Sequence, residues 1–171
     1  MSELKPQGLK KSQILLYGFF GMFLNTFYLM FLAYNRLFYL TNVLQLSTQI
    51  SAVVNTLSVW GNVVTMLLAG AIIEKFTFKS GKFRTWTIIG GIVVGIAFTL
   101  LFANFGLSQG VAGALFVVMF VIQSIGYNTL WVAERSLVGP MSTTAADANS
   151  LAMVAQQGST LGGLIYGVVN P

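Results

Sequence analysis

Three ionisable side chains lie within long apolar stretches, where they could hold a charged substrate or carry a proton: Arg36, Glu134 and Arg135. A charge at the centre of a bilayer costs about 2.5–3.5 kcal/mol on insertion scales, so each needs a reason to be there. Glu134 and Arg135 point about 100° apart on a helix and need not pair with each other. Both also fit a second role, in which long side chains reach the interface or hold helix ends together. For Arg36, reaching the interface is the simpler explanation.

The lack of cysteine and histidine and the small number of acidic residues exclude most enzymatic and metal chemistry. The chain of 171 residues has no cysteine and no histidine, which removes thiolate nucleophiles, disulfides, and the commonest metal ligand and general base. The acidic residues are only Glu3, Glu74, Glu134 and Asp147. Without paired carboxylates in the apolar stretches, an enzyme is the least favoured class, and no cofactor or metal site is expected.

The elements that carry these side chains are membrane helices. Only 8% of the residues are charged and 56% are hydrophobic, whereas a soluble domain has about 25% charged residues. Continuous apolar runs of roughly 20 residues favour spanning helices over strands. The sequence predicts an all-α integral membrane protein, with an N-terminal segment at 1–12 and a transmembrane bundle at 13–171. The expected spans are about 13–40, 49–74, 85–104, 110–138 and 148–169.

The placement of the basic residues orients the chain. Three lysines precede the first span, and Lys75, Lys79, Lys82 and Arg84 surround the second connection, whereas the first and third connections carry no charge. Basic residues mark cytoplasmic segments. We therefore expect a multi-pass protein of the plasma membrane with a cytoplasmic N-terminus. The net charge of +5 is then a topology signal, and no nucleic-acid partner is expected.

Polar side chains recur at helical spacing in four of the spans. The narrowest stripe is in the second span, where Ser51, Asn55, Ser58, Asn62 and Thr65 follow one another at steps of four and three. The comparable faces are Gly18, Gly21, Asn25, Tyr28, Asn35, Arg36 and Tyr39 in the first span, Gln123, Ser124, Tyr127, Asn128, Trp131, Glu134 and Arg135 in the fourth, and Asn149, Gln156, Thr160, Gly163 and Gly167 in the fifth.

Two interpretations of these faces remain open. Small and hydroxyl residues often hold helices together, which is the favoured role for Ser51, Ser58 and Thr65 taken singly. Asn, Gln, Tyr and Arg are larger and costlier to bury, which favours a solvated path lined by spans one, two, four and five. The third span is almost entirely apolar and is expected to face lipid.

Glycines at spacings of four predict close approach between helices. The pairs are Gly91 with Gly95, Gly158 with Gly162, and Gly163 with Gly167. They indicate that the fifth span packs tightly against a neighbour.

The connection between the second and third spans reads Lys79-Ser80-Gly81-Lys82-Phe83-Arg84-Thr85-Trp86. It resembles the R-x-G-K-x-R-P-W loop of the glycoside–pentoside–hexuronide:cation symporters, with Thr85 in place of the proline. Other segments agree in order and spacing, and the resemblance covers about residues 13–170: Tyr17-Gly18, Leu37 to Ser47, Trp60, Tyr127 and Ser136-Leu137-Val138.

The resemblance implies the major facilitator fold, with two six-helix halves rocking about a central site. The chain then holds five helices of one half-bundle and is an incomplete N-terminal portion that needs a C-terminal half or a partner subunit. The implied function is secondary active transport of a sugar or related glycoside or uronate by alternating access. The alternative is a small membrane substrate-binding subunit of a multi-subunit uptake system.

The resemblance and the polar faces together suggest the site residues. The family's sugar-stacking tryptophan aligns with Arg135, and Trp131, one turn earlier, could replace it. The proposed substrate-binding residues are Asn25, Tyr28, Asn62, Tyr127, Trp131 and Arg135. Glu134 is the coupling candidate. Gly81, Lys82 and Arg84 form the cytoplasmic gate loop.

The chain departs from the family at the cation site, which there uses acidic side chains. The corresponding positions hold Asn25, Gly61 or Asn62, Thr65 and Trp131. Because hard cations prefer anionic oxygen, the usual sodium site is not expected. Two alternatives remain for the coupling ion: neutral oxygens bind sodium weakly, or Glu134 carries a proton.

Overall fold

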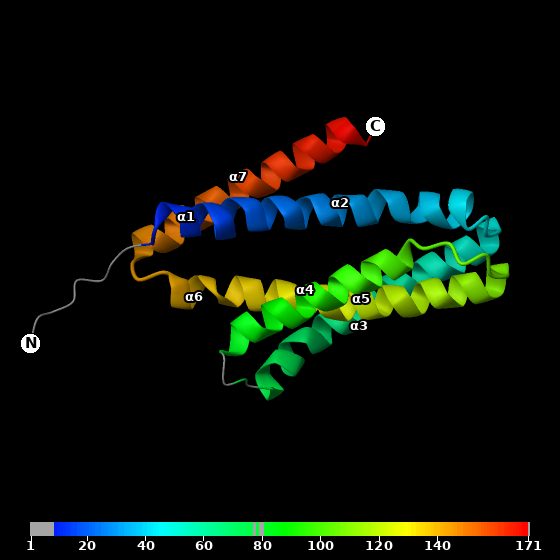
Figure 1. Cartoon of the computed structure of the whole chain (residues 1–171), viewed down its shortest axis with the longest axis horizontal. Coiled ribbons are helices and arrows are strands. Elements are labelled where there is room, and N and C mark those ends of the chain that lie inside the picture. Colours follow the sequence, from blue (N-terminus) through cyan, green and yellow to red (C-terminus); the bar gives the residue numbers. More distant parts are fainter. Residues whose placement is uncertain (1–8, 77, 79–80, 171) are drawn as a thin grey trace, which may run out of the picture. The chain divides into compact units, whose positions relative to one another are not determined.

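The computed structural model describes residues 9–76, 78 and 81–170, and all regular structure in these residues is helical. The first helix is continuous over Lys11–Val43. It comprises α1 (Lys11–Gln13), a π-helix η1 (Ile14–Gly21), α2 (Met22–Phe38) and a second π-helix η2 (Tyr39–Val43). It is followed by α3 (Thr48–Lys75), α4 (Lys82–Leu101), α5 (Gln109–Ser136), the short α6 (Val138–Met141) and α7 (Ala145–Val169). Figure 1 follows these helices along the chain.

These helices confirm the predicted all-α membrane architecture, with ends that differ from the expected spans by a few residues. Within the described residues, four helical segments are long and apolar enough to cross a membrane: Lys11–Val43, Thr48–Lys75, Lys82–Leu101 and Gln109–Met141. The fifth long helix, α7, is 25 residues long but more polar, since it carries Asn149, Gln156, Gln157 and several hydroxyl residues.

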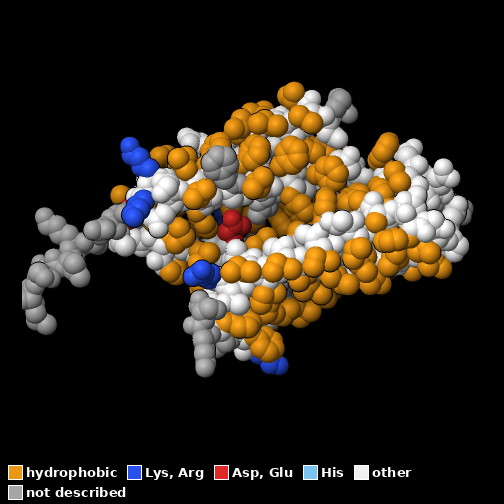
Figure 2. Space-filling model, in the orientation of Figure 1, with side chains coloured by type: hydrophobic (Ala, Val, Ile, Leu, Met, Phe, Trp, Pro, Cys, Tyr) orange, Lys and Arg blue, Asp and Glu red, His pale blue; other side chains and the backbone are white. Residues whose placement is uncertain are grey.

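Large apolar side chains cover the surface. Leu67 is 77% exposed and Val168 is 82% exposed, and Figure 2 shows many hydrophobic side chains on the visible face and few charged ones. Contiguous apolar surface of this extent is unfavourable in water and suits lipid.

The chain forms two compact units. Unit 1 contains residues up to Arg36 and from Val138 onward, and unit 2 contains Leu37–Leu137.

In unit 1, α7 packs directly on the backbone of the first helix. A Cβ added at Gly158 would strike the carbonyl oxygen of Phe19, and one at Gly162 would lie 2.6 Å from that of Phe23. The predicted close approach at Gly158 and Gly162 is therefore confirmed. Gly163 makes only ordinary contact with Thr26, and nothing lies within 4 Å of a Cβ at Gly167 among the described residues.

Two side-chain hydrogen bonds extend this contact along the helices. The hydroxyls of Thr26 and Ser159 are 2.7 Å apart. Nδ2 of Asn35 donates to the hydroxyl of Tyr166 at 2.7 Å. Each pair satisfies polar groups that would otherwise be costly in an apolar surrounding.

The helix α7 begins with a reciprocal capping box. The Thr144 hydroxyl accepts from the amide of Asp147 at 3.1 Å, and the Asp147 carboxylate accepts from the amide of Thr144 at 3.2 Å. The hydroxyl of Thr143 also donates to this carboxylate, at 2.8 Å. These bonds satisfy amides at the helix start that have no partner within the helix.

The pKa of Asp147 is lowered from its ordinary value of 3.8, chiefly because the hydroxyl of Thr143 donates to the carboxylate. Since the folded pKa is the lower one, the cap stabilises the folded state above the ordinary value and is lost as the pH falls below it. We expect hydrogen exchange in the first turn of α7 to accelerate between pH 5 and pH 2, after correction for intrinsic rates, and Asp147→Asn to remove most of this pH dependence. An unchanged pH dependence in the variant would contradict the assignment.

In unit 2, α5 packs against both α3 and α4. The backbones of α4 and α5 come close at Gly90, where an added Cβ would lie 2.8 Å from the carbonyl oxygen of Gly126. Among the residues that the structure describes, nothing lies within 4 Å of a Cβ at Gly91 or Gly95, so the predicted close approach at these two glycines is wrong. The apolar side chains of Ile88, Ile92 and Ile96 point outward, each more than half exposed.

The contact with α3 uses the polar stripe of the second span. Ser51, Ser58 and Thr65 are at most 5% exposed. The Ser58 hydroxyl donates to the carbonyl of Val54 at 2.7 Å, and that of Thr65 to the carbonyl of Asn62 at 3.0 Å. Because a back-bonded hydroxyl needs no further donor partner, these residues fit a packing role.

Candidate functional site

Three side chains form a stacked row on α5, which we call the aromatic ladder: Tyr127, Trp131 and Arg135. They are four residues apart and so lie on one helix face. The two rings are 6.3 Å apart between centroids, with 19° between their planes. The guanidinium carbon of Arg135 lies 4.2 Å from the centroid of the Trp131 ring.

The ladder combines a flat apolar surface with a fixed cation. Trp131 and Tyr127 are partly exposed, and Arg135 is exposed. Stacking on Trp131 holds the guanidinium in place by a cation–π attraction worth about 0.5–2 kcal/mol. An aromatic face suits the C–H face of a sugar, while guanidinium N–H groups can donate to hydroxyls or a carboxylate.

A second group of polar residues joins α5 to α3, and we call it the amide cluster: Asn62, Thr65 and Asn128. The side-chain nitrogen of Asn128 donates to the hydroxyl oxygen of Thr65 at 2.9 Å. It also lies 3.2 Å from Oδ1 of Asn62 and 3.4 Å from its carbonyl oxygen. Thus Asn62, predicted to bind substrate, is here engaged in a bond between helices.

The remaining predicted site residues are divided between the units. Asn25 and Tyr28 lie on α2 in unit 1, one turn apart and half-buried. Glu134 is half-buried on α5, next to Arg135 at the end of the ladder. Unit 2 by itself therefore brings together Tyr127, Trp131 and Arg135, with Glu134 beside them.

The predicted gate loop includes the start of α4. Gly81 precedes the helix with φ of 103°, a conformation that L side chains rarely adopt. Lys82 and Arg84 occupy the first turn of α4, and the amine of Lys82 lies 5.7 Å from the Phe83 ring centroid. Lys79 and Ser80 of the loop signature lie outside the described residues.

The sequence placed Asn128, the central residue of the amide cluster, on the polar face of the fourth span but did not include it among the proposed site residues. Asn62 and Asn128 lie on the polar faces of two separate spans. This was the feature of the sequence that could have suggested a hydrogen bond between these spans. Tyr39 was predicted to share the polar face of the first span. Instead it is 6% exposed and packs against the rings of Phe102 and Phe116, with centroids 5.0 and 6.2 Å away.

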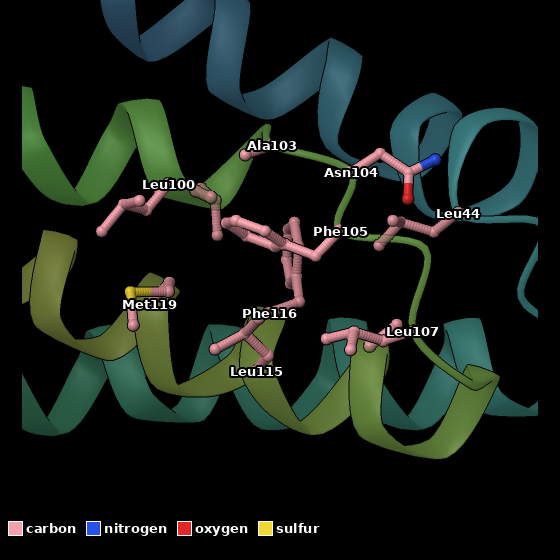
Figure 3. Close-up of a pocket in the computed structure, with 11 residues that line it drawn as sticks. Leu44, Leu100, Ala103, Asn104, Phe105, Leu107, Leu115, Phe116 and Met119 are labelled. Carbon is pink, nitrogen blue, oxygen red and sulfur yellow. The ribbon is translucent and has the colours of Figure 1, made fainter.

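A small pocket lies in unit 2 where α4 ends and α5 begins, and Figure 3 shows side chains from both helices and their connection around it. Its volume is about 20 Å³, enough for about one water molecule. Its apolar lining includes Phe105, Leu107, Leu115, Phe116 and Met119. It is too small for a sugar.

Comparisons with known proteins agree on one family. Residues 12–171 match the family described as MFS/sugar transport protein. The raffinose carrier protein of Pediococcus pentosaceus is 31% identical over 104 residues, which are 58% of this chain and 16% of that protein. The lactose permease of Lactobacillus delbrueckii subsp. bulgaricus is 28% identical over 113 residues, 64% of this chain and 18% of that protein. No solved structure matches.

The matched segments cover less than a fifth of either relative. The family and both relatives are carriers rather than enzymes, and they do not favour the alternative of a binding subunit. They confirm the resemblance to glycoside–pentoside–hexuronide:cation symporters, with a multi-pass membrane architecture. This chain belongs to the MFS/sugar transport protein family.

Proposed function

We propose that this chain is the N-terminal portion of a secondary active transporter that moves a sugar, or a related glycoside or uronate, across the plasma membrane by alternating access. The raffinose carrier and lactose permease relatives support a glycoside substrate. The positions of the basic residues support a cytoplasmic N-terminus. We further propose that a C-terminal half or partner subunit completes the transporter, which is supported by the small share of each relative that the matched segments cover.

The observation that carries this proposal is the aromatic ladder. Trp131 presents a partly exposed ring for the C–H face of the sugar, and Arg135 is held 4.2 Å above it. In the proposed bound state the guanidinium donates to sugar hydroxyls, or to the carboxylate of a uronate. Asn25 and Tyr28 on α2 remain proposed substrate-binding residues of unit 1.

The direct test is counterflow by the full-length protein in proteoliposomes. Vesicles loaded with raffinose or lactose should take up labelled sugar from outside without any ion gradient. A panel of galactosides, uronates and sugar alcohols as competitors would define the substrate class. Absence of counterflow with every member of the panel, by protein that is folded and inserted, would contradict sugar transport.

We propose Glu134 as the group that carries the coupling proton, because it is half-buried beside Arg135 on α5. A Glu134→Gln variant can neither take up nor release a proton, so it should lose accumulation driven by a pH gradient. It should retain counterflow, since exchange of sugar for sugar requires no net proton movement. Accumulation and counterflow measured on the same vesicles separate these outcomes. Full pH-driven accumulation by the variant would remove Glu134 from coupling.

We also propose that Lys82 and Arg84, in the first turn of α4, contact the partner half when the cytoplasmic side is closed. Their alternative role is topology marking alone. Transport by a Lys82→Gln/Arg84→Gln double variant that inserts normally distinguishes the two. A reduced rate is expected, and an unchanged rate would leave only the topology role.

A further inference from the structure

Three oxygen atoms converge on one nitrogen in the amide cluster. The side-chain nitrogen of Asn128 lies 2.9 Å from Oγ1 of Thr65, 3.2 Å from Oδ1 of Asn62 and 3.4 Å from the carbonyl oxygen of Asn62. Proteins hold small hard cations where several oxygens converge in this way. Here the position at the centre belongs to an amide NH₂ group, whose hydrogens carry partial positive charge.

The oxygen atoms of the amide cluster suit the amide NH₂ group rather than a cation. An amide, a hydroxyl and a backbone carbonyl supply the oxygens, and none of the three residues is a carboxylate. The Thr65 hydroxyl already donates to the carbonyl of Asn62 at 3.0 Å, which leaves its lone pairs for Asn128. A sodium ion at this point would have to displace the NH₂ group and leave that donor unsatisfied.

Burial makes such a displacement more costly. Thr65 is 5% exposed and Asn128 is 6% exposed, so water cannot replace the lost bonds. The contact also lies where α3 and α5 pack together, so moving the amide would disturb the helix contact itself.

We propose that the side-chain amide of Asn128 permanently occupies the position of a cation between α3 and α5, so that the two helices stay joined and transport proceeds without sodium or lithium. The part of this inference that concerns transport rests on the proposed function. The part that concerns the Asn128 contact between α3 and α5 does not depend on it. Of the two alternatives for the coupling ion, it removes weak sodium binding by neutral oxygens and leaves the proton.

The test begins with the unaltered full-length protein, purified in detergent without sugar. Its melting temperature should be the same in sodium, lithium and choline chloride at matched ionic strength. A saturable rise in sodium or lithium would overturn the proposal. This measurement requires no substitution and no transport, so it is independent of the sugar hypothesis.

The second arm converts the amide to a carboxylate. In an Asn128→Asp variant the oxygens of Asn62 and Thr65 would surround a negative group, and a cation should now bind there. We expect a lower melting temperature in choline and a saturable rise of about 2 °C or more on adding sodium. The matched control is Asn149→Asp, the same change at an exposed position of α7, which should show no specific sodium response.

The outcomes separate the two hypotheses. If the Asn128→Asp protein is folded and its melting temperature does not rise with sodium, the assignment of a cation position is overturned, whatever the protein transports. Sugar counterflow that fails while both melting results hold would contradict the proposed function alone. Sodium-dependent counterflow by the unaltered protein would overturn the inference and leave sugar transport intact.

Discussion

Replacement of Gly158 by alanine is expected to lower the free energy of unfolding by at least about 1–3 kcal/mol. The added methyl group would strike the carbonyl oxygen of Phe19 on the first helix. Backbone cannot rotate away as a flexible side chain can, so α7 must move outward. That movement would also weaken the contact at Gly162, one turn later, and the bond between Thr26 and Ser159.

The same change at Gly167 provides a control with the opposite expected sign. Nothing among the described residues lies within 4 Å of a Cβ there, and alanine is favoured over glycine in a helix by up to about 1 kcal/mol. Thermal unfolding of both full-length variants in detergent, with size-exclusion profiles, measures the difference. Equal melting temperatures for Gly158→Ala and Gly167→Ala would contradict the close backbone contact in unit 1.

The sequence predicted the helices well because their signal is strong. Long apolar runs with few charges favour membrane helices, and the observed helices begin and end within a few residues of the expected spans. The pairing of Gly158 with Gly162 was also correct. A glycine spacing does not say which neighbour is present, however, and in the third span Gly90 rather than Gly91 makes the close contact.

Side-chain faces in the first span were harder to predict because its helix is not uniform. The segments η1 and η2 are π-helical, and the wider turn changes the face on which each later residue lies. This shift concerns Gly18 and Gly21, which lie inside η1. Tyr39 follows the regular helix α2, and it is buried because the rings of Phe102 and Phe116 from outside the first span pack against it. Nothing in the local sequence marks these π-helical segments.

The candidate site was partly predictable for a similar reason. Tyr127, Trp131 and Arg135 are four residues apart on one regular helix, so spacing alone placed them on one face. The amide cluster depends on how α3 and α5 pack against each other, and residue spacing within one helix does not show this. The sequence could place Asn62 and Asn128 each on a polar face, but not against each other.

Replacement of Trp131 by alanine is expected to lower the affinity for sugar strongly. It removes the ring on which the sugar is proposed to stack and the support that holds Arg135 in place. Burial of a large aromatic side chain against a ligand is worth about 1.5–3 kcal/mol, so the apparent affinity for sugar should fall about 10–100-fold. The melting temperature should change little, because Trp131 is partly exposed.

Two further variants decide whether the ring itself is responsible. Trp131→Phe keeps a flat apolar surface and should retain affinity within a few-fold of the unaltered protein. Trp60→Ala removes an indole that is 65% exposed on α3, outside the ladder, and should leave the affinity unchanged. Concentration dependence of counterflow gives the affinity for each variant. If Trp131→Ala and Trp60→Ala shift it equally, the effect is a general one of lost aromatic surface, and the ladder is not the sugar-binding surface.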